Sequence, residues 1–180
     1  MKLLKSMSLL FLLLFFSCGE QADDSSKKSE GTKEADKKEE STEGAFTTLD
    51  GNSANLDNLK GKVVLIDFWA TWCPPCKAGM PTMQAISKQY EGKDFVMIGV
   101  SLDNKPDIAA DYVKKNNFTY TFWFGKDKQL IKKRFEFQGI PALFLLDKEG
   151  KTVWNHIGFN ASDAEGEKAK ITAEIDKYLK

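Results

Sequence analysis

The chain has 180 residues, and its 26 lysines and arginines balance its 26 aspartates and glutamates, so the formal net charge is zero. This balance excludes the strong positive charge that draws many proteins to nucleic acids or to anionic membrane surfaces. The sequence contains three cysteines, Cys18, Cys73 and Cys76, which are too few for a disulfide scaffold or a four-cysteine zinc site.

The N-terminus has the features of a secretory signal. Two early lysines precede an apolar run at residues 9–16, which is as long as a signal-peptide core but shorter than the roughly 20 residues that span a bilayer. Ser17 and Cys18 follow directly and resemble a bacterial lipobox, with Phe15 where leucine is usual. We therefore predict a lipoprotein signal peptide at residues 1–17 and lipidation of Cys18. The alternatives are an ordinary secretory signal and a buried apolar segment with a chance cysteine.

A charged segment follows the signal. Residues 19–44 contain no aromatic side chain and no aliphatic one larger than alanine. Such a segment cannot bury enough apolar surface to offset the entropy lost when it is ordered. A charge-rich helix is the alternative, but Gly31 and Gly44 oppose it. We expect residues 18–44, from the lipidated Cys18 onward, to be a disordered tether that holds a soluble domain away from a membrane.

The remaining residues, 45–180, are long enough to form one domain with its own core. Continuous apolar runs rich in β-branched residues predict buried strands at residues 62–70 and 94–102. Two further runs, at residues 142–147 and 151–159, flank the turn sequence KEG. This pattern predicts a β-hairpin.

Helical stretches separate these strands. We predict helices at residues 74–91, 105–117, about 127–135, and 161–179. Strands that alternate with helices indicate an α/β sheet. In the sequence FTYTFWF, four aromatic side chains share one face of an extended segment, namely Phe118, Tyr120, Phe122 and Phe124. We assign this row to the core, with a binding surface as the alternative.

The sequence WCPPC stands where the first buried strand ends and the first helix begins. A helix N-terminus carries partial positive charge and free N–H groups, so a thiolate there has a lowered pKa and is reactive at neutral pH. We expect Cys73 at the exposed tip and Cys76 one turn inward, close enough to cycle between dithiol and disulfide. Pro74 and Pro75 fit the first helical turn, where their missing N–H groups cost little.

Two other interpretations of this cysteine pair are open. The pair could supply half of a metal site, or it could be a structural staple. A staple is the weaker of these, because closing so small a ring removes little chain entropy. The placement between strand and helix, with Trp69 and Trp72 close before the pair, favours a redox pair.

The stretches VVLIDFWATWCPPCKAGMP and GIPALFLLDKEGK resemble the thioredoxin superfamily, and within it the membrane-tethered TlpA/ResA type of thiol–disulfide oxidoreductase. The resemblance covers about residues 45–178, and residues 103–124 look like the segment that this subgroup inserts into the basic plan. It implies an α/β, thioredoxin-like fold, in which a central mixed β-sheet carries helices on both faces.

Matched residue by residue, the resemblance makes Cys73 the attacking cysteine and Cys76 the resolving one. Pro141 matches the family's cis-proline, which faces the redox pair and exposes the backbone of Ile140 to a substrate strand. The alternative is a trans proline at the start of a strand. Trp72 matches a tryptophan that shapes the exposed, substrate-binding surface beside the cysteines.

Asp67 interrupts the apolar strand and matches the buried acid of thioredoxin. A buried carboxylate is costly, and burial should raise its pKa, so that Asp67 becomes a candidate proton acceptor for Cys76. TlpA/ResA relatives more often carry asparagine here. Many of them place a glutamate three residues after the second cysteine, where this chain has Gly79. The alternative is that Asp67 only anchors structure through hydrogen bonds.

The resemblance implies a lipid-anchored thiol–disulfide oxidoreductase on the extracytoplasmic, periplasmic side of a bacterial cell envelope. Its substrates would be protein disulfides, with apocytochrome c among them, and a membrane thiol–disulfide protein would return its electrons. Pro74 and Pro75 lack N–H groups that could stabilise the Cys73 thiolate, which favours a reductant. We expect no cofactor, no bound metal and no nucleic-acid partner, and we expect a monomer.

Two other function classes compete with this one. Cys73, Cys76 and His156 could form the copper site of a metallochaperone, although related metallochaperones usually space their cysteines one residue wider. Otherwise His156 is a surface residue of a strand. The second class is a surface lipoprotein whose fold serves only interaction, against which the intact set of Cys73, Cys76, Pro141 and Asp67 speaks.

Overall fold

The computed structural model of the chain describes residues 41–180. The predicted signal peptide at 1–17, the lipidation of Cys18 and most of the tether at 18–44 lie outside the described residues. In the described part of the chain, no helix is long and apolar enough to cross a membrane.

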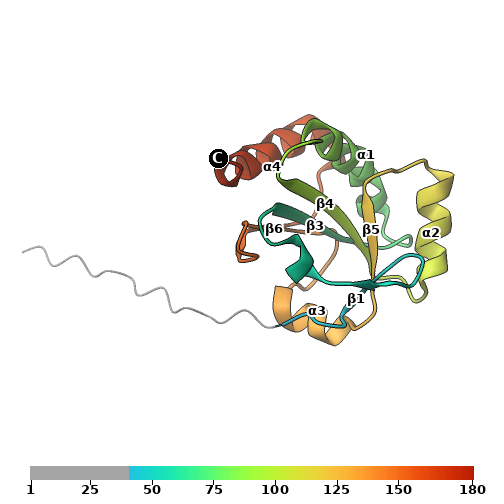
Figure 1. The fold of residues 1–180 in the computed structure, drawn as a ribbon. Helices are drawn as coiled ribbons and strands as arrows, with labels where there is room; N and C mark the ends of the chain where they lie inside the picture. Colours follow the sequence, from blue (N-terminus) through green and yellow to red (C-terminus); the bar gives the residue numbers. More distant parts are fainter. Residues whose placement is uncertain (1–40) are drawn as a thin grey trace, which may run out of the picture. The chain divides into compact units, whose positions relative to one another are not determined.

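A seven-stranded sheet forms the centre of the domain (Figure 1), with the strand order β2-β1-β5-β4-β3-β6-β7. The strands are β1 (Phe46–Thr48), β2 (Ser53–Ala54), β3 (Val63–Trp69), β4 (Phe95–Ser101), β5 (Thr121–Gly125), β6 (Ala142–Leu146) and β7 (Thr152–Ile157). Strands β3, β4 and β5 are parallel, and the other pairs are antiparallel. The sheet is therefore mixed, as predicted, and every residue of the interior strand β3 is buried.

Four α-helices in the described residues cover the sheet. They are α1 (Pro74–Gln89), α2 (Pro106–Lys115), α3 (Lys128–Phe135) and α4 (Ala164–Tyr178), and short 3-10 turns lie at Leu56–Leu59 and Ala161–Asp163. Met83 of α1 and Ile171 of α4 belong to one core cluster, whereas Ile131 of α3 belongs to a second one. Successive residues of β3, such as Leu65 and Ile66, belong to the two clusters in turn, because successive side chains of a strand point to opposite faces of the sheet. The α/β fold with helices on both faces is confirmed.

Most of the predicted elements lie within two or three residues of their expected limits. The hairpin is confirmed, since β6 and β7 pair antiparallel around the KEG turn. In the aromatic row, Tyr120 and Phe122 are buried in the core, with ring centroids 4.1 Å apart, whereas Phe118 and Phe124 are half-buried. The core assignment of the row is therefore confirmed for its two middle members.

Candidate active site

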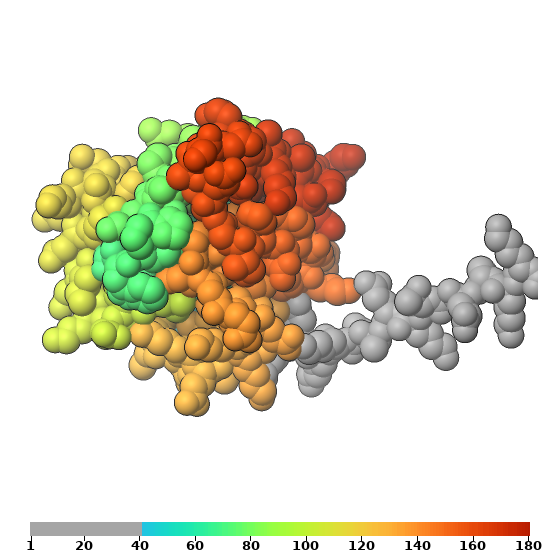
Figure 2. All heavy atoms as spheres, turned by 180° about the vertical axis from the view of Figure 1, so that it is seen from behind, coloured from blue at the N-terminus to red at the C-terminus, as the bar shows by residue number. Residues whose placement is uncertain are grey.

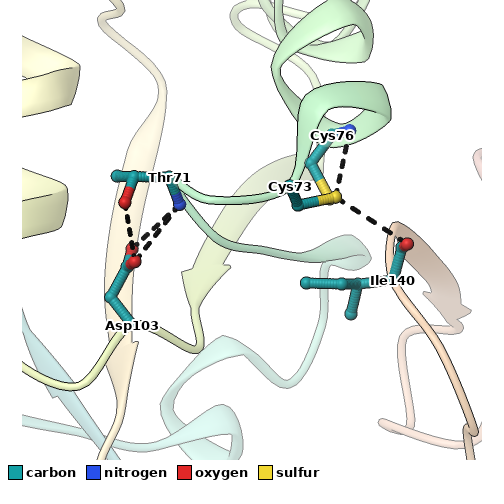
Figure 3. The surroundings of a disulfide bond; sticks show 5 residues. All are labelled: Thr71, Cys73, Cys76, Asp103 and Ile140. Atoms are coloured by element: carbon teal, nitrogen blue, oxygen red, sulfur yellow. Dashed lines mark hydrogen bonds between the residues drawn. A yellow bond between two sulfur atoms is a disulfide. The ribbon is translucent and has the colours of Figure 1, made fainter.

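The two cysteines of the WCPPC sequence form a disulfide between the end of β3 and the start of α1. Cys73 is the N-cap residue of α1, and the backbone N–H of Cys76 donates to the Cys73 Sγ at 3.2 Å (Figure 3). Pro74 and Pro75 occupy the first turn, as predicted, and donate no hydrogen bond. The amide of Cys76 is thus the one helix-terminal N–H that bonds to this sulfur.

The sulfur atoms are less exposed than the sequence led us to expect. In the disulfide form Cys73 keeps 4% of its accessible surface and Cys76 keeps 1%. The prediction of an exposed Cys73 is wrong for this form, because its sulfur bonds inward to Cys76 and faces the backbone of Ile140. The exposed residue of the site is Trp72, at 65%, in agreement with the prediction for that side chain.

The loop before β6 lies against the disulfide. The Ile140–Pro141 peptide bond is cis, as predicted. The carbonyl oxygen of Ile140 lies 3.8 Å from the Cys73 Sγ (Figure 3), and the carbonyl oxygen of Pro141 accepts a hydrogen bond from Gly158 at 2.8 Å. The 140–141 loop therefore meets the end of β3 and the start of α1 at the cysteine pair, although 67 residues separate Ile140 from Cys73 in the sequence.

Asp67 lies in the middle of β3, between Gly99 of β4 and Leu143 of β6. Its side chain is on the same face of the strand as Leu65 and Trp69, which belong to the core cluster that also holds both cysteines. The residue is 2% exposed, and its Oδ1 has no hydrogen-bond partner. Burial raises the pKa of this carboxyl to about 7, so that Asp67 can gain or lose a proton near neutral pH.

Aromatic rings fill the space beside Asp67. Its neighbour Gly99 has no side chain, and a Cβ there would lie 2.7 Å from the ring of Phe122 and 3.1 Å from that of Tyr120. The hydroxyl of Tyr120 is buried without a hydrogen-bond partner; burial raises the pKa of this tyrosine, and the charge of Asp67 adds to the rise. Because apolar rings rather than a cation surround Asp67, burial decides the pKa of its carboxyl.

At Gly79, where the TlpA/ResA resemblance would place a glutamate, a side chain would be crowded. A Cβ at this buried glycine would lie 3.2 Å from the ring of Phe159. This half-buried ring would have to shift slightly to admit a side chain. Among the described residues, Asp67 and Asp103 are the buried acids, and Asp67 is the one on the face of β3 whose residues Leu65 and Trp69 belong to the core cluster of the cysteines.

Asp103 is a site residue that the sequence did not reveal. It follows β4 and is 1% exposed. One carboxylate oxygen accepts from the Thr71 hydroxyl at 2.8 Å and the other from the Ser101 hydroxyl at 2.8 Å, and both lie 3.2 Å from the Thr71 backbone nitrogen (Figure 3). The carboxylate thus fixes the loop that leads into Cys73. Nothing in the sequence distinguishes Asp103 from an ordinary loop aspartate, because its partners come from two separate segments.

Removing this carboxylate should loosen the site. We expect Asp103→Ala to lower the free energy of unfolding by about 2–4 kcal/mol, because the hydroxyl of buried Ser101 and the hydroxyl and backbone N–H of half-buried Thr71 lose this partner. Denaturant unfolding measures the loss. The control is Asp107→Ala in the exposed first turn of α2, for which we expect less than about 1 kcal/mol. Equal unfolding midpoints for the two variants would contradict the anchoring role of Asp103.

His156 belongs to a different part of the domain. It lies on β7, where its Nε2 is 3.1 Å from a carboxylate oxygen of Glu167, its Nδ1 is 3.2 Å from Lys170, and its ring stacks on Trp154. In residues 41–180, no group of three histidine, cysteine or acidic side chains could hold a metal ion. The structure therefore does not assemble Cys73, Cys76 and His156 into the copper site that the metallochaperone alternative requires.

The known proteins that are similar to this chain agree with one another. The sequence matches the Redoxin family over residues 31–174. The chain is 33% identical over 127 residues to thiol-disulfide oxidoreductase ResA of Bacillus cereus, a match that covers 70% of this chain and 73% of that protein.

Solved structures agree with this result. A thiol:disulfide interchange protein of the thioredoxin family from Chlorobium tepidum TLS matches with a TM-score of 0.62 and 26% identity, over 74% of this chain and 91% of that one. The exposed lipoprotein thioredoxin Etrx1 from Streptococcus pneumoniae strain TIGR4 matches with a TM-score of 0.58 and 26% identity, over 70% of this chain and 96% of that one.

Proposed function

Because the chain belongs to the Redoxin family and is a thiol–disulfide oxidoreductase of the TlpA/ResA type, we propose that it reduces disulfides of proteins outside the cytoplasm. The observation that carries the proposal is the Cys73–Cys76 disulfide at the N-terminus of α1, beside the cis Ile140–Pro141 bond. Such a pair holds two electrons when it is a dithiol and releases them when it closes to a disulfide.

The reaction proceeds in two exchanges. The Cys73 thiolate attacks one sulfur of a client disulfide, a Cys73–client bond forms, and the other client sulfur leaves as a thiolate that takes a proton from water. Cys76 then loses its proton and attacks the Cys73 Sγ. The Cys73–Cys76 bond forms, the second client sulfur leaves, and the client has gained the two electrons that the dithiol has lost.

Asp67 is the proton acceptor that we propose for Cys76. Its carboxyl is buried on the face of β3 that contributes to the cysteine cluster, and its pKa of about 7 suits a base that works near neutral pH. The unpartnered Oδ1 supports this role over that of a hydrogen-bonded anchor, because the oxygen is available to a proton.

Ile140 and Trp72 are the groups that we propose for client binding. The backbone of Ile140 lies beside the Cys73 sulfur, where an extended client segment could pair with it by main-chain hydrogen bonds. Trp72 precedes Cys73 and offers a large exposed apolar surface. Both residues therefore border the sulfur that a client has to reach.

A single-turnover experiment tests the direction of electron flow. The full chain is reduced, separated from reductant, and mixed with an oxidised apocytochrome c peptide, which is the client class that the TlpA/ResA resemblance suggests. We expect mass spectrometry to find the reduced peptide and the Cys73–Cys76 disulfide in equal amounts. If instead the disulfide form of the chain oxidises the dithiol peptide to completion, the reducing direction is wrong.

The lipid anchor is the second part of the proposal. The Ser17–Cys18 sequence after an apolar run and the likeness to an exposed lipoprotein thioredoxin support attachment of Cys18 to a bacterial membrane on its extracytoplasmic side. There a membrane thiol–disulfide donor would return electrons to the disulfide, since the surroundings are oxidising. The anchor would keep the domain close to such a donor.

Replacing Cys18 tests the anchor in cells. We expect Cys18→Ala to lose incorporation of labelled palmitate and to leave the membrane fraction, because the acyl chains supply the membrane affinity. The matched control is Cys76→Ala, which should keep both. Palmitate labelling that survives in Cys18→Ala would show that the chain is not lipidated at this residue.

A further inference from the structure

A hollow opens beside the redox pair, with a volume of about 430 Å³. Its apolar lining comes from three segments, through Trp72, through Leu102, and through Phe137 and Ile140 of one loop. In the view of Figure 2, the start of α1, drawn in green, lies beside the orange segment of α3 and the chain that follows it. A volume of this size is within the range of sites that bury a small ligand or a few side chains.

The hollow is continuous with the site of exchange. Ile140 lines it and also places its carbonyl oxygen 3.8 Å from the Cys73 Sγ. Trp72 lines it as well, and is the residue directly before Cys73. When a client cysteine is bound at the Cys73 sulfur, the client residues next to that cysteine therefore lie at the hollow.

The charged residues that line the hollow are all basic. Lys128 and Lys132 both line the hollow, and no acidic residue does. They are four residues apart on α3, which places them on one face of the helix. Within residues 41–180, neither lysine forms an ion pair with a carboxylate of the chain itself. The nearby carboxylate of Asp127 is engaged otherwise, because it accepts hydrogen bonds from the backbone nitrogens of Gln129 and Leu130.

We propose that this hollow is a specificity site that selects client segments with a carboxylate close to the reactive cysteine. The client's apolar side chain contacts Trp72 and Phe137, and its aspartate or glutamate pairs with Lys128 and Lys132. The carboxylate would lie within roughly four residues of the client cysteine, which corresponds to about 13 Å of extended chain. This inference rests on the proposed function, because it concerns the substrates of the same cysteine pair.

Matched disulfide peptides test the proposal. The reduced full chain is mixed with disulfide peptides that differ at one position. This position carries glutamate, glutamine or lysine. It is placed in turn at each of the four residues before and the four residues after the peptide's cysteine. We expect the glutamate peptide to react roughly two- to five-fold faster than the glutamine peptide at the favoured position, the size of effect that a surface ion pair gives. The lysine peptide should be the slowest, and added salt should reduce the differences.

Variants of α3 assign the effect to the hollow. In a chain with both Lys128→Gln and Lys132→Gln, we expect the ratio of the glutamate rate to the lysine rate to fall close to one. The control is Lys115→Gln together with Lys114→Gln on α2, which removes the same charge away from the hollow and should leave the ratio high. A ratio that persists in the α3 variant, or falls equally in the α2 variant, overturns the inference.

Other outcomes also decide the question. If the unsubstituted chain reduces all peptides equally at every position, the proposed function stands and the specificity site is wrong. If it exchanges disulfides with none of them, the proposed function fails and the inference fails with it. If sedimentation shows a dimer that the α3 variant abolishes, a second copy of the chain fills the hollow, and the inference is overturned.

Discussion

Replacing Asp67 with asparagine is expected to raise the free energy of unfolding by on the order of 4 kcal/mol at about pH 8, and to change it little near pH 4. Burial raises the pKa of this carboxyl from its ordinary value of 3.8 to about 7. Between these two values the folded chain holds a proton that the unfolded chain has released. The stability of the unsubstituted chain therefore falls as pH rises from about 4 to about 7, and asparagine removes this loss.

Denaturant unfolding of both chains across this pH range measures the effect. The matched control is Asp103→Asn, at the other buried acid, whose carboxylate accepts hydrogen bonds from Thr71 and Ser101. Because that carboxylate is well partnered, we expect Asp103→Asn to destabilise the fold at every pH. Two parallel curves for Asp67→Asn and the unsubstituted chain would contradict a raised pKa at Asp67.

The second large effect concerns the order of attack. We expect Cys73→Ser to abolish disulfide exchange and Cys76→Ser to accumulate a stable mixed disulfide, close to one client per chain. The reason is that Cys73 caps α1 and receives the Cys76 N–H, so that its thiolate is the stabilised one. Non-reducing electrophoresis with mass spectrometry of the linked peptide measures both results.

The reciprocal pattern would contradict this assignment. If Cys73→Ser traps clients through Cys76, the attacking and resolving roles are reversed. Exposure does not decide between the sulfurs, because Cys73 and Cys76 are both almost fully covered in the disulfide form, at 4% and 1%. The prediction rests instead on the position of Cys73 at the N-terminus of α1.

The central elements could be predicted from the sequence because their signals are local. The apolar run of β3, the turn between β6 and β7 and the two prolines at the start of α1 each act through neighbouring residues. The burial of Asp67 followed from its place in an apolar strand for the same reason. Strands β1 and β2 were not predicted, because segments of three and two residues are too short to show a period.

The parts of the site that the sequence did not reveal depend on contacts between distant segments. Asp103 acts through Thr71, from which 32 residues separate it in the chain. The burial of the Cys73 sulfur depends on Ile140, which is 67 residues away. Lys132 stands in a run of basic residues within a predicted helix, and its proposed role arises only because α3 lies beside Trp72. The spacing of residues in a single sequence does not indicate such contacts between distant segments.

The reduction potential of the Cys73–Cys76 pair tests the reducing function most directly. It is measured by equilibrating the full chain with a glutathione or dithiothreitol buffer and quantifying the dithiol. Because one helix N–H bonds to the Cys73 sulfur and the two prolines that follow supply none, the thiolate gains limited stabilisation. We therefore predict a potential closer to that of thioredoxin, about −270 mV, than to that of the oxidant DsbA, about −120 mV. A value near −120 mV would contradict the reducing function.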